Sequence, residues 1–111
     1  MSAVQSVPEV SAADVPEGGW LLDVREPYEW AAGHVPAATH IPMAQLSHRA
    51  GEIPRDGTVY VICRSGNRSA HVVLALAQAG WQAVNVADGM QGWAAARRPM
   101  ISESGAAPTV A

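Results

Sequence analysis

TVYVICRSGNRS, residues 58–69, is the stretch that decides the fold of this 111-residue chain. Its apolar first part, residues 58–62, predicts a buried strand, and the polar residues after it predict a short loop. The residues that follow, 69–79, are apolar and helix-forming, so a strand, a loop and a helix come in that order. In open parallel sheets ligands bind at the carboxyl ends of strands, which is where this order places Cys63.

Cys63 is the only cysteine in the chain, and its surroundings favour a reactive thiol. The amide groups and the positive end of the helix that follows favour a thiolate. Arg64 and Arg68 add positive charge, and Gly66 permits a curled loop whose amides point inward as an anion-binding nest. Three more side chains of the loop can donate hydrogen bonds to an anionic group: Ser65, Asn67 and Ser69. Ser69 has an alternative use as a simple helix cap.

Composition excludes several classes of protein. A hydrophobic content of 49% and a charged content of 15% are typical of a soluble globular protein with one domain and one core. The net charge of -3 gives no overall field that favours nucleic acid or an acidic membrane surface. A single cysteine cannot form an internal disulfide, which excludes a secreted, disulfide-stapled scaffold. The sequence contains no leader-like start and no window long enough for a membrane span, so we expect a cytoplasmic protein.

The rest of the chain alternates between strands and helices. Besides residues 58–62, apolar runs predict strands at residues 7–10, 20–24, 38–41 and 83–86. Helical patterns occur at residues 11–15, 27–32, 43–50, 69–79 and 90–96. Such alternation implies a parallel sheet with helices on both faces. We expect a flexible N-terminus over residues 1–6, one domain over residues 7–100 and a flexible C-terminal tail over residues 101–111.

Several motifs resemble those of the single-domain rhodanese family, the small thiosulfate sulfurtransferases. Leu22-Asp23-Val24-Arg25 resembles the strand-end motif of that family. Glu29-Trp30, followed by Gly33-His34-Val35-Pro36-Ala37-Ala38, resembles its E-[YFW]…G-H-I-P-G-A segment. The loop from Cys63 to Ser69 resembles its active-site loop C-x-x-G-x-R-S, and Asp88-Gly89-Met90-Gln91-Gly92-Trp93 resembles its closing G-G-x-x-x-W.

The resemblance extends from about residue 7 to residue 100, with the motifs in the family's order. There are two departures from the pattern. Ala37 stands in place of the usual glycine, and Asp88 stands in place of the first glycine of the closing motif. Both departures concern local turn geometry more than the thiol.

The resemblance implies a three-layer α/β/α fold around a five-stranded parallel sheet. It also implies that the Cys63 thiolate takes the sulfane sulfur of thiosulfate, or of a related donor, and carries it as a persulfide. The acceptor would be cyanide, a thiol or a thioredoxin-like protein. No cofactor, nucleic acid or membrane is implied, and we expect a monomer. The substrate-binding residues would be Arg64, Ser65, Gly66, Asn67, Arg68 and Ser69, with Arg68 as the main contact to the donor.

Asp23 and Arg25 are expected to support the site. From the end of its strand, Asp23 could hold loop amides or pair with Arg68 or Arg25. An exposed or half-buried ion-pair network of modest energy is expected among Arg25, Glu26 and Glu29. For His34 the resemblance suggests a packing and hydrogen-bonding residue rather than a general base. The remaining histidines lack metal-ligand spacing, so no metal site is expected among His40, His48 and His71.

Two other functions compete with sulfur transfer. A cysteine phosphatase or arsenate reductase of the related dual-specificity type uses a C-x5-R loop, whereas here four residues separate Cys63 from Arg68. Ser69 occupies the place of the phosphatase arginine, and the tighter ring matches a persulfide sulfur better than a phosphate. The third function is a non-catalytic interaction module or a sulfur carrier, although retention of the cysteine weighs against an inactive module. Since the chain has no second cysteine, any regeneration must come from outside.

Overall fold

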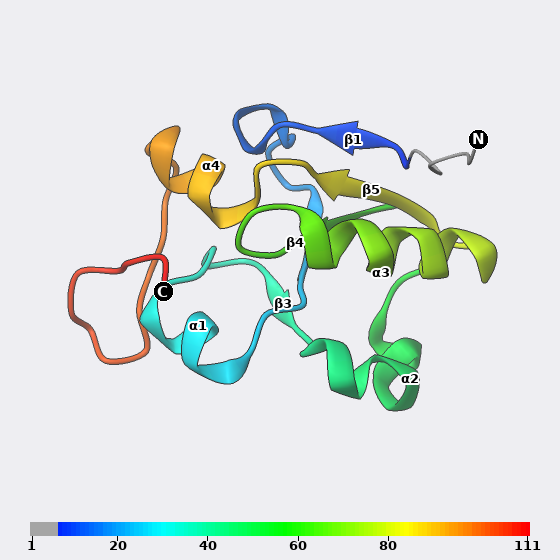
Figure 1. Cartoon of the computed structure of the whole chain (residues 1–111), viewed down its shortest axis with the longest axis horizontal. Helices are drawn as coiled ribbons and strands as arrows, with labels where there is room; N and C mark the ends of the chain where they lie inside the picture. Colours follow the sequence, from blue (N-terminus) through cyan, green and yellow to red (C-terminus); the bar gives the residue numbers. More distant parts are fainter. Residues whose placement is uncertain (1–6) are drawn as a thin grey trace.

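A computed structural model describes residues 7–111, which form a five-stranded parallel sheet with flanking helices (Figure 1). The strand order is β1-β5-β4-β2-β3 and every pairing is parallel, which confirms the expected sheet. The strands are β1 (Glu9–Val10), β2 (Trp20–Asp23), β3 (Thr39–His40), β4 (Thr58–Ile62) and β5 (Gln82–Val86). The flexible N-terminus expected for residues 1–6 lies outside the described residues.

The helices depart from the sequence-based expectations mainly at their ends. The α-helices are α1 (Pro27–Ala32), α2 (Leu46–Arg49), α3 (Asn67–Gln78) and α4 (Gly89–Ala95). The short 3-10 helices are η1 (Ala12–Asp14), η2 (Met43–Gln45) and η3 (Ala50–Glu52). The single helix expected over residues 43–50 is therefore divided into η2, α2 and the start of η3. Helix α3 begins before the expected Ser69, because Gly66 already acts as its N-cap.

The core lies on both faces of the sheet. Along β4, Val59 and Val61 belong to one cluster of buried side chains, whereas Ile62 belongs to the other. Successive side chains of a strand point to opposite faces, so this division follows from the strand itself. Helix α3 supplies Val72, Val73 and Leu76 to the first cluster, and α4 supplies Met90 and Trp93 to the second. Burial on both faces explains why the central strand reads as an uninterrupted apolar run.

The strand order places a topological switch point at the carboxyl ends of β2 and β4. From β2 the chain passes through α1 to β3 on one side, whereas from β4 it passes through α3 to β5 on the other. Asp23 at the end of β2 is in register with Ile62 at the end of β4. The loop that follows β4 therefore starts beside the end of β2, at the point where the two connections diverge. Such a switch point is the general ligand position of open α/β sheets.

Residues 101–111 lie against α1 (Figure 1). Ile101 forms an isolated antiparallel bridge with His34. The amide of Glu103 donates to the carbonyl of Ala31, and the amide of Thr109 donates to the carbonyl of Ala32. These contacts define a path for the segment, whereas the flexibility expected from the sequence stays a prediction. Within residues 7–111, no helix has the length and apolar character that crossing a membrane requires.

Candidate active site

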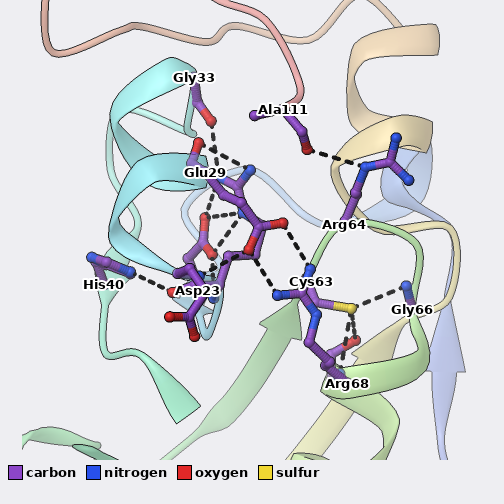
Figure 2. Close-up of polar contacts among 12 residues, drawn as sticks. Asp23, Glu29, Gly33, His40, Cys63, Arg64, Gly66, Arg68 and Ala111 are labelled. Carbon is purple, nitrogen blue, oxygen red and sulfur yellow. Dashed lines mark hydrogen bonds and ion pairs between the residues drawn. The ribbon is translucent and has the colours of Figure 1, made fainter. Parts of the chain in front are cut away.

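The loop after β4 curls around the sulfur of Cys63 (Figure 2). The amide of Gly66 donates to Sγ at 3.1 Å and the amide of Ser69 does so at 3.4 Å. The hydroxyl oxygen of Ser69 lies 3.2 Å from the same sulfur. The Cys63 side chain is buried, with 1% of its surface exposed, yet polar groups rather than hydrocarbon surround its sulfur on this side. The arrangement is an anion cradle at the start of a helix.

Gly66 makes the curl possible. Its φ is +101°, in the left-handed region that side chains disfavour, and a Cβ there would collide with the carbonyl oxygen of Ala87. The loop is thus pressed against the segment after β5 at a place where only a glycine fits. This position is the glycine of the C-x-x-G-x-R-S pattern.

Helix α4 holds the loop from the other side. The amide of Met90 donates to the carbonyl of Cys63 at 2.8 Å, and the amide of Gln91 donates to the carbonyl of Arg64 at 3.0 Å. Gly89, with φ of +58°, permits this approach, since a Cβ on it would lie 2.6 Å from both carbonyl oxygens. Because α4 draws these carbonyl groups outward, the amides that follow them are free to face the sulfur.

The pKa of the Cys63 thiol is lower than its usual value. Burial on its own raises the pKa, since it disfavours a charged sulfur. Hydrogen bonds from the Ser69 hydroxyl and from the amides of Ser69, Gly66 and Ser65 outweigh burial and lower it. The site therefore combines a buried thiol with an enhanced thiolate fraction, which is typical of reactive cysteines.

Arg68 pairs with Glu29 of α1. Its Nη1 and Nη2 donate to the two carboxylate oxygens at 2.7 and 2.8 Å (Figure 2). The hydrogen bonding between the two side chains lowers the pKa of Glu29 and raises the pKa of Arg68. The charge of Cys63 also contributes to raising the pKa of Arg68. Glu29 is only 3% exposed, so its expected place in an exposed or half-buried network is wrong. The two hydrogen bonds from Arg68 compensate for the burial of the Glu29 carboxylate.

Asp23 and Arg25 form a fully buried pair, 2.8 Å apart. Arg25 also donates to the carbonyl oxygen of Gly33 at 2.8 Å, which ties the end of β2 to the end of α1. The expectation that Arg25 is exposed or half-buried is therefore wrong, because carboxylate and carbonyl acceptors around its guanidinium make burial possible. Of the partners proposed for Asp23, Arg25 is the one that donates hydrogen bonds to its carboxylate from the guanidinium group. The carbonyl of Arg25 in turn contacts Nε2 of His40 at 2.7 Å.

Some of the other loop residues contact the sulfur of Cys63, and the rest are exposed at the surface. Ser69 is fully buried against Cys63, and Gly66 caps α3, so Ser69 is not the helix cap. The exposed residues of the loop are Arg64, Ser65 and Asn67. Ser65 nevertheless contributes its amide to the thiol. Arg64 donates from Nε to the carbonyl oxygen of Ala111 at 3.1 Å, so the C-terminal segment reaches the rim of the site (Figure 2).

Asn85 of β5 is a site residue that the sequence analysis missed. It is 1% exposed, and its Oδ1 accepts the Ser69 hydroxyl at 2.5 Å. Its Nδ2 donates to a carboxylate oxygen of Glu9 at 3.0 Å and to the carbonyl of Gly66 at 3.1 Å. The available signal was a polar residue inside the apolar run Ala83-Val84-Asn85-Val86, since a buried amide needs partners.

His34 packs as the sequence suggested. Its ring stacks on that of Trp30 with centroids 3.5 Å apart, and its Nδ1 lies 2.8 Å from the Trp30 carbonyl. Asp88, the departure from the closing motif, accepts the amide of Ala12 at 2.7 Å and so links α4 to η1. Over residues 7–111, no group of three or more His, Cys, Asp and Glu side chains is arranged to hold a metal ion.

Comparison with known proteins agrees with this geometry. A family profile described as the rhodanese-like domain matches residues 8–96. The putative sulfurtransferase YtwF of Bacillus subtilis is 39% identical over 80 residues, covering 72% of this chain and 78% of YtwF. A sulfurtransferase of Allochromatium vinosum is 37% identical, covering 77% of this chain and 80% of that protein. The putative sulfur carrier protein YrkF of Bacillus subtilis is 36% identical over 79% of this chain, which spans only 51% of YrkF.

A solved structure gives the same result. The crystal structure of a rhodanese-related protein from Thermoplasma volcanium matches with a TM-score of 0.79 and 36% sequence identity. The match covers 85% of this chain and 97% of that one. The profile match, these relatives and the shared fold lead to one assignment: the chain belongs to the rhodanese-like domain family.

Proposed function

We propose that this protein is a sulfurtransferase or sulfur carrier that holds a sulfane sulfur as a persulfide on Cys63. The observation that carries the proposal is the cradle of Gly66 and Ser69 amides around a buried sulfur whose pKa is lowered. One of the relatives is named a sulfurtransferase, a second a putative sulfurtransferase and a third a putative sulfur carrier protein, which supports the same chemistry.

Thiosulfate is the donor that we propose for loading. The thiol first loses its proton to solvent, and the Sγ electron pair of Cys63 then attacks the outer sulfur of thiosulfate. A new bond forms between the two sulfurs, the bond from the outer sulfur to the sulfonate breaks, and sulfite leaves with that electron pair. The outer sulfur of the resulting persulfide carries the negative charge, which inward-facing amides and the nearby guanidinium of Arg68 stabilise.

Unloading uses an acceptor from outside the chain. A thiolate of a small thiol or a thioredoxin-like protein, or cyanide, attacks the outer sulfur and forms a bond to it. The bond to Sγ breaks, and Cys63 leaves as a thiolate that is ready for another donor. Donor and acceptor thus react in turn at one sulfur, which gives ping-pong kinetics.

Arg68 is our choice for the main contact to an anionic donor, with the exposed loop residues at the rim. About a third of its side chain is exposed, while Glu29 holds the two terminal nitrogens. A donor dianion competes with the carboxylate of Glu29 for this guanidinium. The pairing therefore keeps the arginine in place between turnovers and limits how tightly the donor binds.

Replacement of Cys63 tests the nucleophile. Cys63→Ser keeps the shape of the side chain but supplies a hydroxyl that cannot form a stable persulfide. We expect sulfite release from thiosulfate, with cyanide as acceptor, to fall to the uncatalysed background, while circular dichroism shows an intact fold. Sulfite release at the original rate in this variant would exclude Cys63 as the sulfur-carrying group.

An aryl phosphate distinguishes the phosphatase alternative. With four residues between Cys63 and Arg68, the loop is one residue shorter than the C-x5-R loop of those enzymes. We expect negligible hydrolysis of a chromogenic aryl phosphate by a preparation that forms the persulfide. Steady turnover of that substrate, abolished in Cys63→Ser, would instead assign the loop to phosphate chemistry.

A further inference from the structure

The hydroxyl of Ser69 lies between two groups that compete for its proton. Its oxygen is 2.5 Å from Oδ1 of Asn85 and 3.2 Å from Sγ of Cys63. A serine hydroxyl has one proton to donate. Both contacts are buried, so solvent does not supply an alternative partner for either acceptor.

The partners of Asn85 decide where that proton goes. Its amide nitrogen faces a carboxylate oxygen of Glu9 and the carbonyl oxygen of Gly66, which only accept hydrogen bonds. An inverted amide would place an oxygen against both of these oxygens, so the orientation of the Asn85 side chain is fixed by its surroundings. Its Oδ1 therefore faces Ser69, and Ser69 must donate to it.

This arrangement treats the three states of Cys63 differently. With its proton on Asn85, Ser69 presents a lone pair to Sγ and can accept a hydrogen bond from the protonated thiol. The same lone pair repels a thiolate, so the Ser69 hydroxyl lowers the pKa of Cys63 only in the orientation in which it donates to Sγ. To reach that orientation, the hydroxyl must rotate away from Asn85. In a persulfide Sγ is uncharged, because the negative charge sits on the outer sulfur, so the Ser69–Asn85 bond is retained.

We propose that Asn85 is a positioning residue which turns the Ser69 hydroxyl away from Cys63 and so disfavours the bare thiolate relative to both the thiol and the persulfide. The inference rests on the proposed function in treating Cys63 as the sulfur carrier. By limiting the thiolate fraction of unloaded Cys63, the Ser69–Asn85 bond slows its oxidation and alkylation. The loop amides of Gly66 and Ser69 remain in place for the loaded state.

Other charged and titratable groups around the site lie outside this bond. Arg64 belongs to the loop, Arg68 belongs to the first turn of α3, and Glu29 of α1 is held by Arg68. Glu9 of β1 accepts a hydrogen bond from the amide nitrogen of Asn85, and Tyr28 of α1 contributes to raising the pKa of Arg68. A substitution of Asn85 leaves all of these side chains present.

Titration of Cys63 in Asn85→Ala tests the proposal. The apparent pKa is measured from the thiolate absorbance at about 240 nm against pH, with Cys63→Ser as the blank. Freeing the Ser69 proton for the thiolate should lower the pKa by about one unit, or roughly tenfold more thiolate at a pH well below the pKa. A merely structural Asn85 predicts the opposite sign, since losing its bond to Gly66 loosens the amide cradle. An unchanged or raised pKa overturns the proposal.

A double-mutant cycle tests whether Asn85 acts through Ser69. In a Ser69→Ala background, Asn85→Ala should leave the pKa of Cys63 unchanged. A downward shift of the same size in that background would show that Asn85 acts by another route and would overturn the proposal. The exposed Gln82, also on β5, gives the matched control Gln82→Ala, for which no shift is expected.

Two features keep the test decisive. If Asn85→Ala fails to fold, Asn85→Val removes the same hydrogen-bonding groups with a side chain suited to a buried strand, and the same downward shift is expected. The titration needs no sulfur donor, so its outcome is independent of whether thiosulfate loads Cys63. A failure of this inference is therefore distinguishable from a failure of the proposed function.

Discussion

At Cys63, hydrogen bonds rather than distant charges control the state of the sulfur. Burial raises the pKa of the thiol, whereas hydrogen bonds from the Ser69 hydroxyl and from the amides of Ser69, Gly66 and Ser65 outweigh burial and lower it. The sequence predicted this environment because Cys63, the glycine of the loop and the following helix are contiguous. It could not predict how Ser69 divides its proton, because Asn85 comes from another strand.

Arg68→Lys tests the proposed donor contact. A lysine keeps a positive charge beside Glu29 but loses the planar fork that binds two oxygens at once. We expect the KM for thiosulfate to rise about tenfold, as for loss of one charged hydrogen bond of roughly 1.5 kcal/mol, while the fold persists. Initial-rate kinetics at several thiosulfate concentrations measure this. An unchanged KM would remove Arg68 from the donor site.

Glu29→Gln tests the stability of the buried pair. Arg68 lowers the pKa of Glu29 in the folded protein, so the unfolded chain binds more protons as the pH falls. The stabilisation is complete above the usual carboxyl pKa of about 4.5 and is lost as the pH falls through the lower folded value.

The variant should therefore lose about 2 kcal/mol of unfolding free energy at pH 7. Its stability should also decline less steeply than that of the native protein as the pH is lowered below about 4.5. Urea unfolding at a series of pH values measures both quantities. Equal slopes for the native protein and the variant would mean that the pair does not couple to folding.

The burial of Arg25 could not be predicted from the neighbouring residues in the sequence. A motif with alternating charge reads as a surface network, and the sequence predicted one. The structure instead surrounds Arg25 with Asp23 and the carbonyl of Gly33, which come together only when β2 and α1 pack. Whether a charged side chain can be buried depends on acceptors that other segments supply.

At the scale of elements, the loop between β4 and α3 depends on a glycine. Gly66→Ala adds a Cβ that meets the Ala87 carbonyl at a φ of +101°. We expect it to destabilise the protein by more than about 2 kcal/mol and to raise the pKa of Cys63, since the amide cradle must open.

Gly18→Ala is the matched control for this prediction. Gly18 also has a positive φ, +78°, but a Cβ there meets nothing within 4 Å. It should cost about 1 kcal/mol through backbone strain alone and leave the thiol titration unchanged. Urea unfolding and the thiolate absorbance measure both effects. Equal losses in the two variants would contradict a close fit of the loop against Ala87.

The order of the elements was predictable, and several of their boundaries were not. Apolar runs fixed the position of β4, and its neighbours in the sheet were confirmed as parallel strands. Helix α3 began earlier than expected because the left-handed Gly66 ends the loop. The network of Asn85 could not be read from one strand, since it requires the pairing of β5 with β1 and the approach of the loop.

At the scale of the whole molecule, the C-terminal segment reaches the rim of the site. The amides of Glu103 and Thr109 donate to carbonyls at the end of α1, and Ala111 accepts from Arg64. These contacts predict slowed hydrogen–deuterium exchange at Glu103 and Thr109, compared with the exposed Gly105, for which no such contact is expected. Exchange of all three amides at the rate of an unstructured peptide would favour the flexible tail that the sequence predicted.

The strand order explains why the residues of the candidate site lie together at the carboxyl ends of the strands. Asp23 and Cys63 are 40 residues apart in the sequence, yet Asp23 ends β2 and Cys63 follows β4, and the ends of these adjacent parallel strands are in register. The sequence indicated part of this arrangement, since it placed both Asp23 and Cys63 at the carboxyl ends of predicted strands. The C-terminal segment gave no comparable signal, because its small and polar residues bind mainly through backbone groups.

Intact-mass analysis after incubation with thiosulfate tests the central claim most directly. We predict one adduct of about 32 Da, one sulfur atom, which disappears on addition of cyanide and never forms in Cys63→Ser. A protein whose mass stays unchanged under thiosulfate and other sulfane-sulfur donors, while Cys63 titrates as a thiol of lowered pKa, would contradict a persulfide carrier.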